Sequence, residues 1–451
     1  MSYQSINPTT GELLKEFPND PFPDLSKSQT AFAAWKILKP ENRVVYFESL
    51  RKIMELKTEE LARLISMEMG KPFEEAKAEI TKSCSAIQYY VEHGPQLLRD
   101  QPVPLAAKEC YVRCEPLGII FGIMPWNFPF WQLFRFAIPT MIAGNVIILK
   151  HSSNVPQCAS AIVELFKSAL PDNTFLNYFL DNKTAGEVLA DARIAGLSFT
   201  GSNTTGSLLA SLAGKNLKKV VMELGGNDPF IILEDADIPA AVSLAVKSRS
   251  INGGQACNGA KRFIPVKKIA DEFTARLIES VQRLNVGDPF SAETNIGPLA
   301  RKDLAEKVSE QVKKTVSQGA VPHYGKKTNL ASENFVQPVV LTGVKPGMIS
   351  FEEEVFGPVW SVTEAEDEED AIRLANQSMF GLAAALMTRS LETAHRIIPQ
   401  LETGNVYVNE FVRSNPYLPF GGVKESGFGR ELGEQGIREF INLKSVFIQD
   451  H

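Results

Sequence analysis

Residues 117–149 read LGIIFGIMPWNFPFWQLFRFAIPTMIAGNVIIL, and they indicate the class of fold that the chain adopts. The residues from Leu117 to Phe134 carry no charge, which reaches the lower limit for a membrane span, about 18 apolar residues. Three prolines interrupt the segment, however, and proline disfavours a helix interior by about 3 kcal/mol. A buried strand, a loop, a helix and a second buried strand divide the segment without strain, so we expect protein core and no membrane span.

Short apolar runs alternate with amphipathic helices after this segment, and residues 24–100 before it show helical periodicity. Unbroken apolar strands separated by helices are typical of a parallel sheet covered on both faces. The pair Gly225-Gly226 interrupts the pattern, and a second alternating region follows, so we expect an α/β protein with two units. The expected strands are 117–123, 145–150, 175–180, 196–200 and 219–224, then 230–233, 262–266, 335–341, 360–362 and 404–409, with a last strand at 445–449.

The composition excludes several classes of protein. With 44% hydrophobic and 22% charged residues, the 451-residue chain is neither disordered nor fibrous. Its 47 basic and 53 acidic residues give a net charge of −6, so no nucleic-acid partner is expected. The five cysteines are scattered and odd in number, which favours a reducing compartment. The first ten residues lack the basic and apolar regions of a signal peptide, so we expect a cytoplasmic protein.

Cys257 is the candidate nucleophile. It lies in the glycine-rich stretch NGGQACNGAK at residues 252–261, where small neighbours leave the thiol approachable and let backbone N–H groups face it. A free thiol has a pKa of about 8.5, so a nucleophilic role needs local activation. A single cysteine is more often a buried packing residue, and the glycine-rich setting is what favours the catalytic interpretation.

Four further polar residues stand where a ligand site is expected. Glu223 ends a strand beside two glycines, at the strand edge where α/β proteins bind ligands, although a surface position is the alternative. Asn127 lies among apolar and proline residues, so its amide is either structural or bonded to a substrate oxygen. Lys150 at a strand end and Ser202 at a helix start are candidates for phosphate and ribose contacts.

Six motifs, in the same order, resemble the signature blocks of the aldehyde dehydrogenase superfamily. They are Pro125-Trp-Asn-Phe-Pro129, Phe199-Thr-Gly-Ser202, Met222-Glu-Leu-Gly-Gly-Asn-Asp-Pro229, Gly254-Gln-Ala-Cys257, Glu354-Val-Phe-Gly-Pro358 and Pro419-Phe-Gly-Gly-Val-Lys424. Each motif alone is weak, but together they are specific. The stretch Lys150-His-Ser-Ser-Asn-Val-Pro156, with Arg135 and a short N-terminus, resembles the compact bacterial NAD(P)-dependent succinate-semialdehyde dehydrogenases within that family.

The resemblance implies an aldehyde dehydrogenase-like fold with a Rossmann-like cofactor domain, an α/β catalytic domain and a β oligomerisation arm. The cofactor domain would comprise residues 1–225 and a return segment at 426–440, with arm strands inserted at about 107–116. The catalytic domain would comprise residues 226–425, and residues 441–451 would form the oligomerisation strand. An edge strand of this kind needs a partner, so a homodimer or homotetramer is expected.

The resemblance also implies the catalytic roles. Cys257 would attack the aldehyde carbonyl to give a thiohemiacetal, and the Asn127 amide and the Cys257 backbone N–H would hold the oxyanion. After oxidation leaves a thioester, Glu223 would activate the water that hydrolyses it. Glu431 matches a position that can assist this proton transfer. No metal is required.

The implied cofactor is NAD or NADP. The residues placed on it are Lys150 and Glu354 at the riboses, and Trp126, Gly201, Ser202 and Phe356 along the diphosphate and the nicotinamide. NAD-preferring relatives often carry a glutamate where this chain has Ser153. Without that carboxylate a 2′-phosphate is not repelled, so we expect NADP to be accepted, the alternative being a neutral Ser153 and a preference for NAD.

The implied substrate is a small semialdehyde. Arg135 resembles the arginine that binds the substrate carboxylate in succinate-semialdehyde dehydrogenases; the alternative is an arginine that bridges subunits or loops. A second substrate arginine of some relatives is Ile251 here, and Arg413 is a candidate to replace it. The leading hypothesis is oxidation of succinate semialdehyde to succinate. The alternatives are glutarate semialdehyde or a medium-chain aliphatic aldehyde as substrate, and a non-catalytic structural or binding protein.

Overall fold

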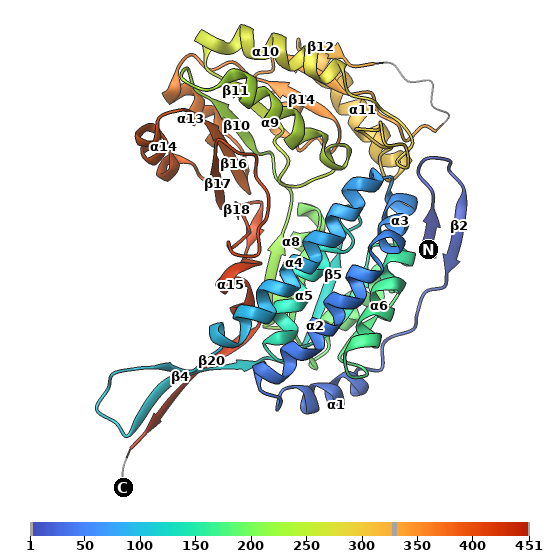
Figure 1. Ribbon diagram of the computed structural model, residues 1–451, viewed down its shortest axis with the longest axis vertical. Helices are drawn as coiled ribbons and strands as arrows, with labels where there is room; N and C mark the ends of the chain where they lie inside the picture. Colours follow the sequence, from blue (N-terminus) through green and yellow to red (C-terminus); the bar gives the residue numbers. More distant parts are fainter. Residues whose placement is uncertain (1–2, 327–331, 450–451) are drawn as a thin grey trace.

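The computed structural model describes residues 3–326 and 332–449 and contains two large sheets (Figure 1). The six-stranded sheet has the order β19-β9-β8-β5-β6-β7, and the seven-stranded sheet has the order β12-β13-β14-β11-β10-β16-β17. The chain passes from the first sheet to the second between β9 and β10. The strands of the first sheet are β5 (Ile119–Met124), β6 (Val146–His151), β7 (Phe175–Asn177), β8 (Ile194–Thr200), β9 (Lys219–Glu223) and β19 (Gly427–Phe428).

The apolar segment 117–149 folds as the sequence predicts. Strands β5 and β6 pair in parallel, and α5 (Trp131–Ile142) between them is buried along its whole length. The Asn145 side chain accepts hydrogen bonds from the backbone N–H groups of Leu117 and Gly118, at 2.8 and 3.0 Å, which fixes the start of β5. In the described part of the chain, no helix is both long and apolar enough to cross a membrane.

Helices cover both faces of the first sheet. Helices α2, α4, α5 and α6 lie side by side along it, and α7 and α8 contact β8 and β9 (Figure 1). The expected helical region before residue 100 divides into four helices. The bounds are α1 (Leu25–Trp35), α2 (Pro40–Leu56), α3 (Thr58–Met69), α4 (Phe73–Leu97), α6 (Pro156–Ala169), α7 (Asn182–Ala190) and α8 (Asn203–Lys215).

The second sheet is also buried on both faces, because Ile231 of β10 joins one apolar cluster while its neighbours Phe230 and Ile232 join another. Its strands are β10 (Pro229–Ile232), β11 (Arg262–Pro265), β12 (Val321–Tyr324), β13 (Val339–Thr342), β14 (Val359–Val362), β16 (Ala383–Met387) and β17 (Asn405–Val408). Its helices are α9 (Ile238–Ser250), α10 (Lys267–Gln282), α11 (Lys302–Ser317), α12 (Ile349–Glu352), α13 (Glu368–Asn376) and α14 (Leu391–Ile397).

The structure differs from the predicted elements in one strand boundary and in several strands that were not predicted. The strand expected at 335–341 begins only at Val339, and the sequence analysis missed the central strand β16. Alanine favours helices, but the alanines of β16 are buried between β10 and β17, so tertiary packing overrides the local preference. The hairpin β1–β2 (Tyr3–Ile6 and Leu13–Phe17) and β12 were also missed.

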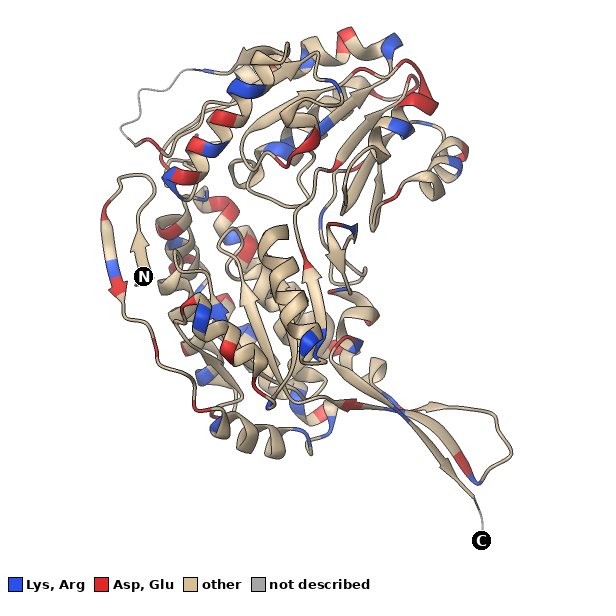
Figure 2. Ribbon diagram, turned by 180° about the vertical axis from the view of Figure 1, so that it is seen from behind, with Lys and Arg blue, Asp and Glu red and all other residues tan. Residues whose placement is uncertain are grey.

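A narrow three-stranded sheet projects from the body of the molecule (Figure 1). Strand β4 (Glu109–Pro116) pairs antiparallel with β20 (Ile441–Ile448), and β3 (Gln101–Pro102) pairs with β4 on its other edge. This is the arm that the resemblance implies. The domain boundaries themselves stay a prediction, and residues 1–2, 327–331 and 450–451 of the predicted domains lie outside the described residues. Figure 2 shows acidic and basic residues interspersed over the surface helices, in keeping with the small net charge.

Candidate active site

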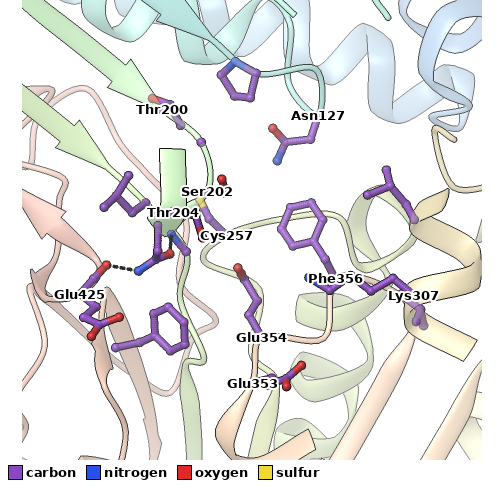
Figure 3. Close-up of a pocket in the computed structure, with 18 of the residues that line it drawn as sticks. Asn127, Thr200, Ser202, Thr204, Cys257, Lys307, Glu353, Glu354, Phe356 and Glu425 are labelled. Atoms are coloured by element: carbon purple, nitrogen blue, oxygen red, sulfur yellow. Dashed lines mark hydrogen bonds between the residues drawn. The ribbon is translucent and has the colours of Figure 1, made fainter. Parts of the chain in front are cut away.

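A cavity of about 690 Å³ lies where the carboxyl ends of the first sheet's parallel strands face the second sheet (Figure 3). Its volume is in the range of sites for small ligands. Strand β5 leads into the Asn127 loop, β8 leads into Gly201 and Ser202, and β9 leads into Gly225, so three strand ends meet at one edge. Seven of the predicted site residues line it: Trp126, Asn127, Gly201, Ser202, Cys257, Glu354 and Phe356.

Cys257 reaches the cavity because of an unusual turn. In the short 3-10 helix Ile251–Gly254, the residues Asn252, Gly253 and Gly254 have φ angles of 53, 62 and 78°, a left-handed run that favours glycine. A Cβ atom on Gly254 would lie 2.2 Å from the carbonyl oxygen of Gly357, so that position requires glycine. The turn leaves Cys257 half-buried at the cavity wall, which favours the nucleophile over the packing alternative.

The thiol of Cys257 rests in its neutral form. Burial raises the pKa of Cys257 to about 11, although the positive charges of Arg135 and Lys261 act in the opposite direction. A thiol is a poor nucleophile compared with its thiolate, so a base has to remove the proton before attack. Cys257 therefore needs activation in the bound complex.

Asn127 faces the cavity on the Cys257 side (Figure 3). Its Nδ2 donates to the carbonyl oxygen of Gln255 at 2.9 Å, and its Oδ1 accepts from Nε2 of Gln132 at 3.1 Å. The Asn252 side chain donates to the Asn127 carbonyl oxygen at 2.8 Å. These bonds fix the amide in place, and an amide N–H held beside the thiol is suited to bind an oxyanion.

Two carboxylates of helix α4 hold the loops on which Asn127 and Cys257 lie. Glu79 accepts from the backbone N–H groups of Phe130 and Trp131, at 2.9 and 3.0 Å. Glu75 accepts from the backbone N–H of Asn252 at 2.7 Å. Both carboxylates therefore act as positioning groups. The sequence analysis missed them, because α4 carries no local motif and the contacts span long sequence separations.

Glu223 and Glu431 lie behind the cavity on either side of Arg135. The Nη2 atom of Arg135 is 3.8 Å from Oε2 of Glu223, and its Nε forms an ion pair with Glu431. All three side chains are buried, so Glu223 is not the surface residue of the alternative reading. Burial raises the pKa of Glu223 well above its ordinary value, while Arg135 lowers it and the charge of Glu431 raises it further.

Arg135 does not line the cavity. Its guanidinium lies between the chain's own two carboxylates and 5.1 Å from the ring centroid of Phe420. This geometry agrees with the alternative in which the arginine bridges neighbouring segments. The assignment of Arg135 as the substrate's carboxylate anchor therefore has no support from its position.

Other residues that line the cavity fit a dinucleotide. Helix α8 begins there, with Ser202 as its N-cap, and the free N–H groups of a helix start favour phosphate. A Cβ atom on Gly225 would lie 2.6 Å from the Glu354 carboxylate, so glycine keeps the cavity open at this point. The rings of Trp126 and Phe356, which also line the cavity, meet edge to face at 6.0 Å. These residues fit the phosphate and ring parts of NAD or NADP.

Besides Glu223, Glu431 and Arg135, three predicted residues lie outside this cavity: Lys150, Ser153 and Arg413. Lys150 ends β6, where burial lowers its pKa and Asp181 raises it, and Ser153 follows at an exposed position. In the described chain, Lys150 forms no ion pair, so its ammonium is available to a ribose or a phosphate. Arg413 is exposed, and its Nη2 lies 3.1 Å from a carboxylate oxygen of Glu410.

The chain is similar to known proteins over nearly its whole length. The matching protein family is described as "Aldehyde dehydrogenase family", over residues 1–446. A Synechocystis protein named probable succinate-semialdehyde dehydrogenase, with NADP(+) as its cofactor, is 41% identical over 99% of this chain and 100% of its own length. An Escherichia coli succinate semialdehyde dehydrogenase, named for NAD(P)+, is also 41% identical, over 98% of this chain and 97% of its own. The crystal structure of a Streptococcus pyogenes succinic semialdehyde dehydrogenase with NADP+ matches with a TM-score of 0.96 and 33% identity, covering 99% of this chain and all of the other.

Proposed function

This chain belongs to the aldehyde dehydrogenase family, and we propose on that basis that it oxidises succinate semialdehyde to succinate with NADP+ or NAD+. The observation that carries the proposal is the half-buried thiol of Cys257 at a cavity that is also lined by the N-terminus of helix α8. The names of the relatives support succinate semialdehyde as the substrate. The same chemistry on other aldehydes is the second candidate, because Arg135 is already paired with Glu431.

Cys257 and Asn127 perform the first step. The Cys257 thiol passes its proton to a water molecule, the resulting thiolate forms a bond to the aldehyde carbon, and the carbonyl oxygen becomes an oxyanion as its π bond breaks. The Asn127 amide donates to that oxygen, and removal of one such donor typically costs about 2.7–4 kcal/mol. The chemistry that NAD(P)+ supplies when bound is the acceptance of a hydride.

Glu223 performs the second step, the hydrolysis of the thioester left on Cys257. Its carboxylate takes a proton from a water molecule, and the resulting hydroxide attacks the thioester carbon. A base works best when its pKa lies near the operating pH, and burial moves the pKa of Glu223 upward in that direction. Arg135 stabilises the ionised form of Glu223, whereas the negative charge of Glu431 opposes it.

Two further properties belong to the proposal. The absence of an acidic side chain at Ser153 favours acceptance of NADP, since nothing there repels a 2′-phosphate.

The arm strands β4 and β20 leave Leu443 and Phe447 exposed, at 58% and 57%, so we expect them to be covered in a homodimer or homotetramer. All five cysteines are unpaired, as expected for a cytoplasmic protein.

The test is a panel of initial rates with succinate semialdehyde, glutarate semialdehyde, butanal and hexanal, each with NAD and with NADP. Cys257→Ala serves as the blank. We expect the highest kcat/KM with succinate semialdehyde, and turnover with NADP. A higher kcat/KM for the neutral aldehydes would favour the second candidate, the same chemistry on other aldehydes. If no aldehyde gave a rate that depends on Cys257, the protein would be a non-catalytic structural or binding protein.

A further inference from the structure

Lys261 joins the loop of the nucleophile to the loop that carries Glu354. It lies four residues after Cys257, directly before β11, and its side chain is buried. Its Nζ donates to the carbonyl oxygens of Ala256, at 3.1 Å, and of Cys257. The same Nζ lies 3.1 Å from Oε1 of Glu354. A lysine ammonium has three N–H donors, so these three acceptors satisfy it completely.

The two carboxylate oxygens of Glu354 have different surroundings. Oε1 faces Lys261 and also accepts from the backbone N–H of Gly226, at 3.2 Å. Across residues 3–326 and 332–449, no group donates a hydrogen bond to Oε2. Glu354 lines the cavity, and its side chain is 19% exposed. The protein therefore fixes the carboxylate by one oxygen and leaves the other for a hydroxyl donor, such as that of a ribose.

The same ion pair acts on the Cys257 thiol through its two charges. Burial raises the pKa of this thiol to about 11, and the cations Arg135 and Lys261 lower it. The carboxylates Glu223 and Glu354 act in the opposite direction and raise it. Because Lys261 lies against Glu354 and carries the opposite charge, it offsets the effect of that carboxylate on the thiol.

We propose that Lys261 is a positioning residue that turns the free oxygen of Glu354 toward the cofactor and offsets the charge of that carboxylate at the Cys257 thiol. This inference rests on the proposed function, in which NADP+ or NAD+ occupies the cavity. A carboxylate beside the cofactor helps to hold it, but a negative charge near the thiol opposes formation of the thiolate. Lys261 keeps the first effect and limits the second.

The first test measures alkylation of Cys257 by iodoacetamide in the protein without cofactor, with Cys257→Ala as the blank. Lys261→Met and Glu354→Gln break the same ion pair but remove opposite charges. At about pH 8, well below the pKa of the thiol, the rate follows the thiolate fraction, so one pKa unit changes it about tenfold. We expect alkylation to be roughly tenfold slower in Lys261→Met and faster than wild type in Glu354→Gln. Unchanged rates, or a change in the same direction in both variants, would overturn the charge argument, because loss of structure does not distinguish the two charges.

The second test measures the dissociation constant of NADPH by its fluorescence, with Lys218→Met as the matched control. Lys218 also donates to two backbone carbonyl oxygens, those of Asp191 and Ile194, but it precedes β9 at the end opposite to Glu223. The constant should rise at least about fivefold in Lys261→Met, because Glu354 loses the charge-assisted bond that orients it, and stay unchanged in Lys218→Met. An unchanged constant in Lys261→Met would overturn the positioning role. Lys261→Gln, which keeps a donor and loses the charge, takes its place in both tests if Lys261→Met folds poorly.

Neither measurement uses an aldehyde, so this inference and the proposed function fail in distinguishable ways. If the wild-type protein binds neither NADPH nor NADH, the proposed cofactor is wrong. If the wild-type protein binds NADPH and the Lys261 variant binds it equally well, the cofactor stands and the role of Lys261 is wrong.

Discussion

Replacement of Arg135 by methionine distinguishes two roles for this arginine: a charge partner of Glu223, or the anchor of the substrate carboxylate. In the structure its Nη2 lies 3.8 Å from Glu223. Two unit charges at that separation interact by about 4 kcal/mol at an effective dielectric constant of about 20, which corresponds to about three pKa units. Loss of the cation therefore raises the pKa of Glu223 further, and less of the carboxylate base is ionised at neutral pH. We expect hydrolysis of the thioester to slow by at least about tenfold at pH 7, with activity recovering as the pH rises.

The assay is the reduction of NADP followed before and during steady state. Acylation of Cys257 does not use Glu223 as the water-activating base, but the charge of Arg135 also lowers the pKa of the Cys257 thiol. Arg135→Met should therefore keep a burst amplitude equal to the enzyme concentration, with a slower burst phase, and lose the steady-state rate. The loss should be equal for succinate semialdehyde and butanal, since the effect lies in deacylation. Removal of one partner of a buried ion pair also costs about 3–5 kcal/mol of stability, so each variant is compared at a temperature below its own Tm.

Arg135→Lys is the matched control, because it keeps the charge and should keep most of the steady-state rate. A loss confined to succinate semialdehyde, with butanal unaffected and no change in the pH profile, would refute the reasoning. That result would make Arg135 the substrate anchor, as the sequence resemblance first implied.

Three other changes test the site, the cofactor and the arm. Glu75→Ala should lower kcat about tenfold with little change in KM, because Asn252 loses its acceptor, whereas Glu75→Gln keeps an acceptor and should retain activity; equal losses in both variants would contradict the positioning role. Ser153→Glu should raise the KM for NADP at least about tenfold and leave the KM for NAD nearly unchanged, since a carboxylate repels a 2′-phosphate; a parallel change in both constants would show that Ser153 lies away from the phosphate. Phe447→Glu should shift the protein to smaller assemblies in sedimentation velocity, because this exposed ring lies on the arm; an unchanged sedimentation coefficient would place the interface elsewhere.

The elements that the sequence predicted well are those with strong local patterns. Strands β5, β6 and β8 are continuous apolar runs, and Asn127, Lys150 and Gly201 lie at or just after their ends. Ligand sites of α/β proteins lie at the carboxyl ends of the strands, so the sequence predicted much of the cavity lining. The turn before Cys257 was likewise predictable from its glycines, since only glycine tolerates the approach to Gly357. These features depend on a few neighbouring residues.

What the sequence could not predict depends on contacts between distant segments. The pairing of Arg135 with Glu431 joins residues nearly three hundred positions apart, so the arginine was read from its place in a helix alone. Strand β16 was missed because alanines look helical until two neighbouring strands bury them.

The return of the C-terminal segment to the first sheet bears on when the enzyme becomes active during its synthesis. Gly427 of β19 pairs with Glu223 of β9, and Glu431 follows directly after this short strand. A nascent chain that already displays Cys257 and Asn127 therefore still lacks Gly427, which pairs with Glu223, and Glu431, which pairs with Arg135. Turnover has to wait until residues 427–431 have left the ribosome, so translation products truncated before them would carry the thiol without the means to release what it captures.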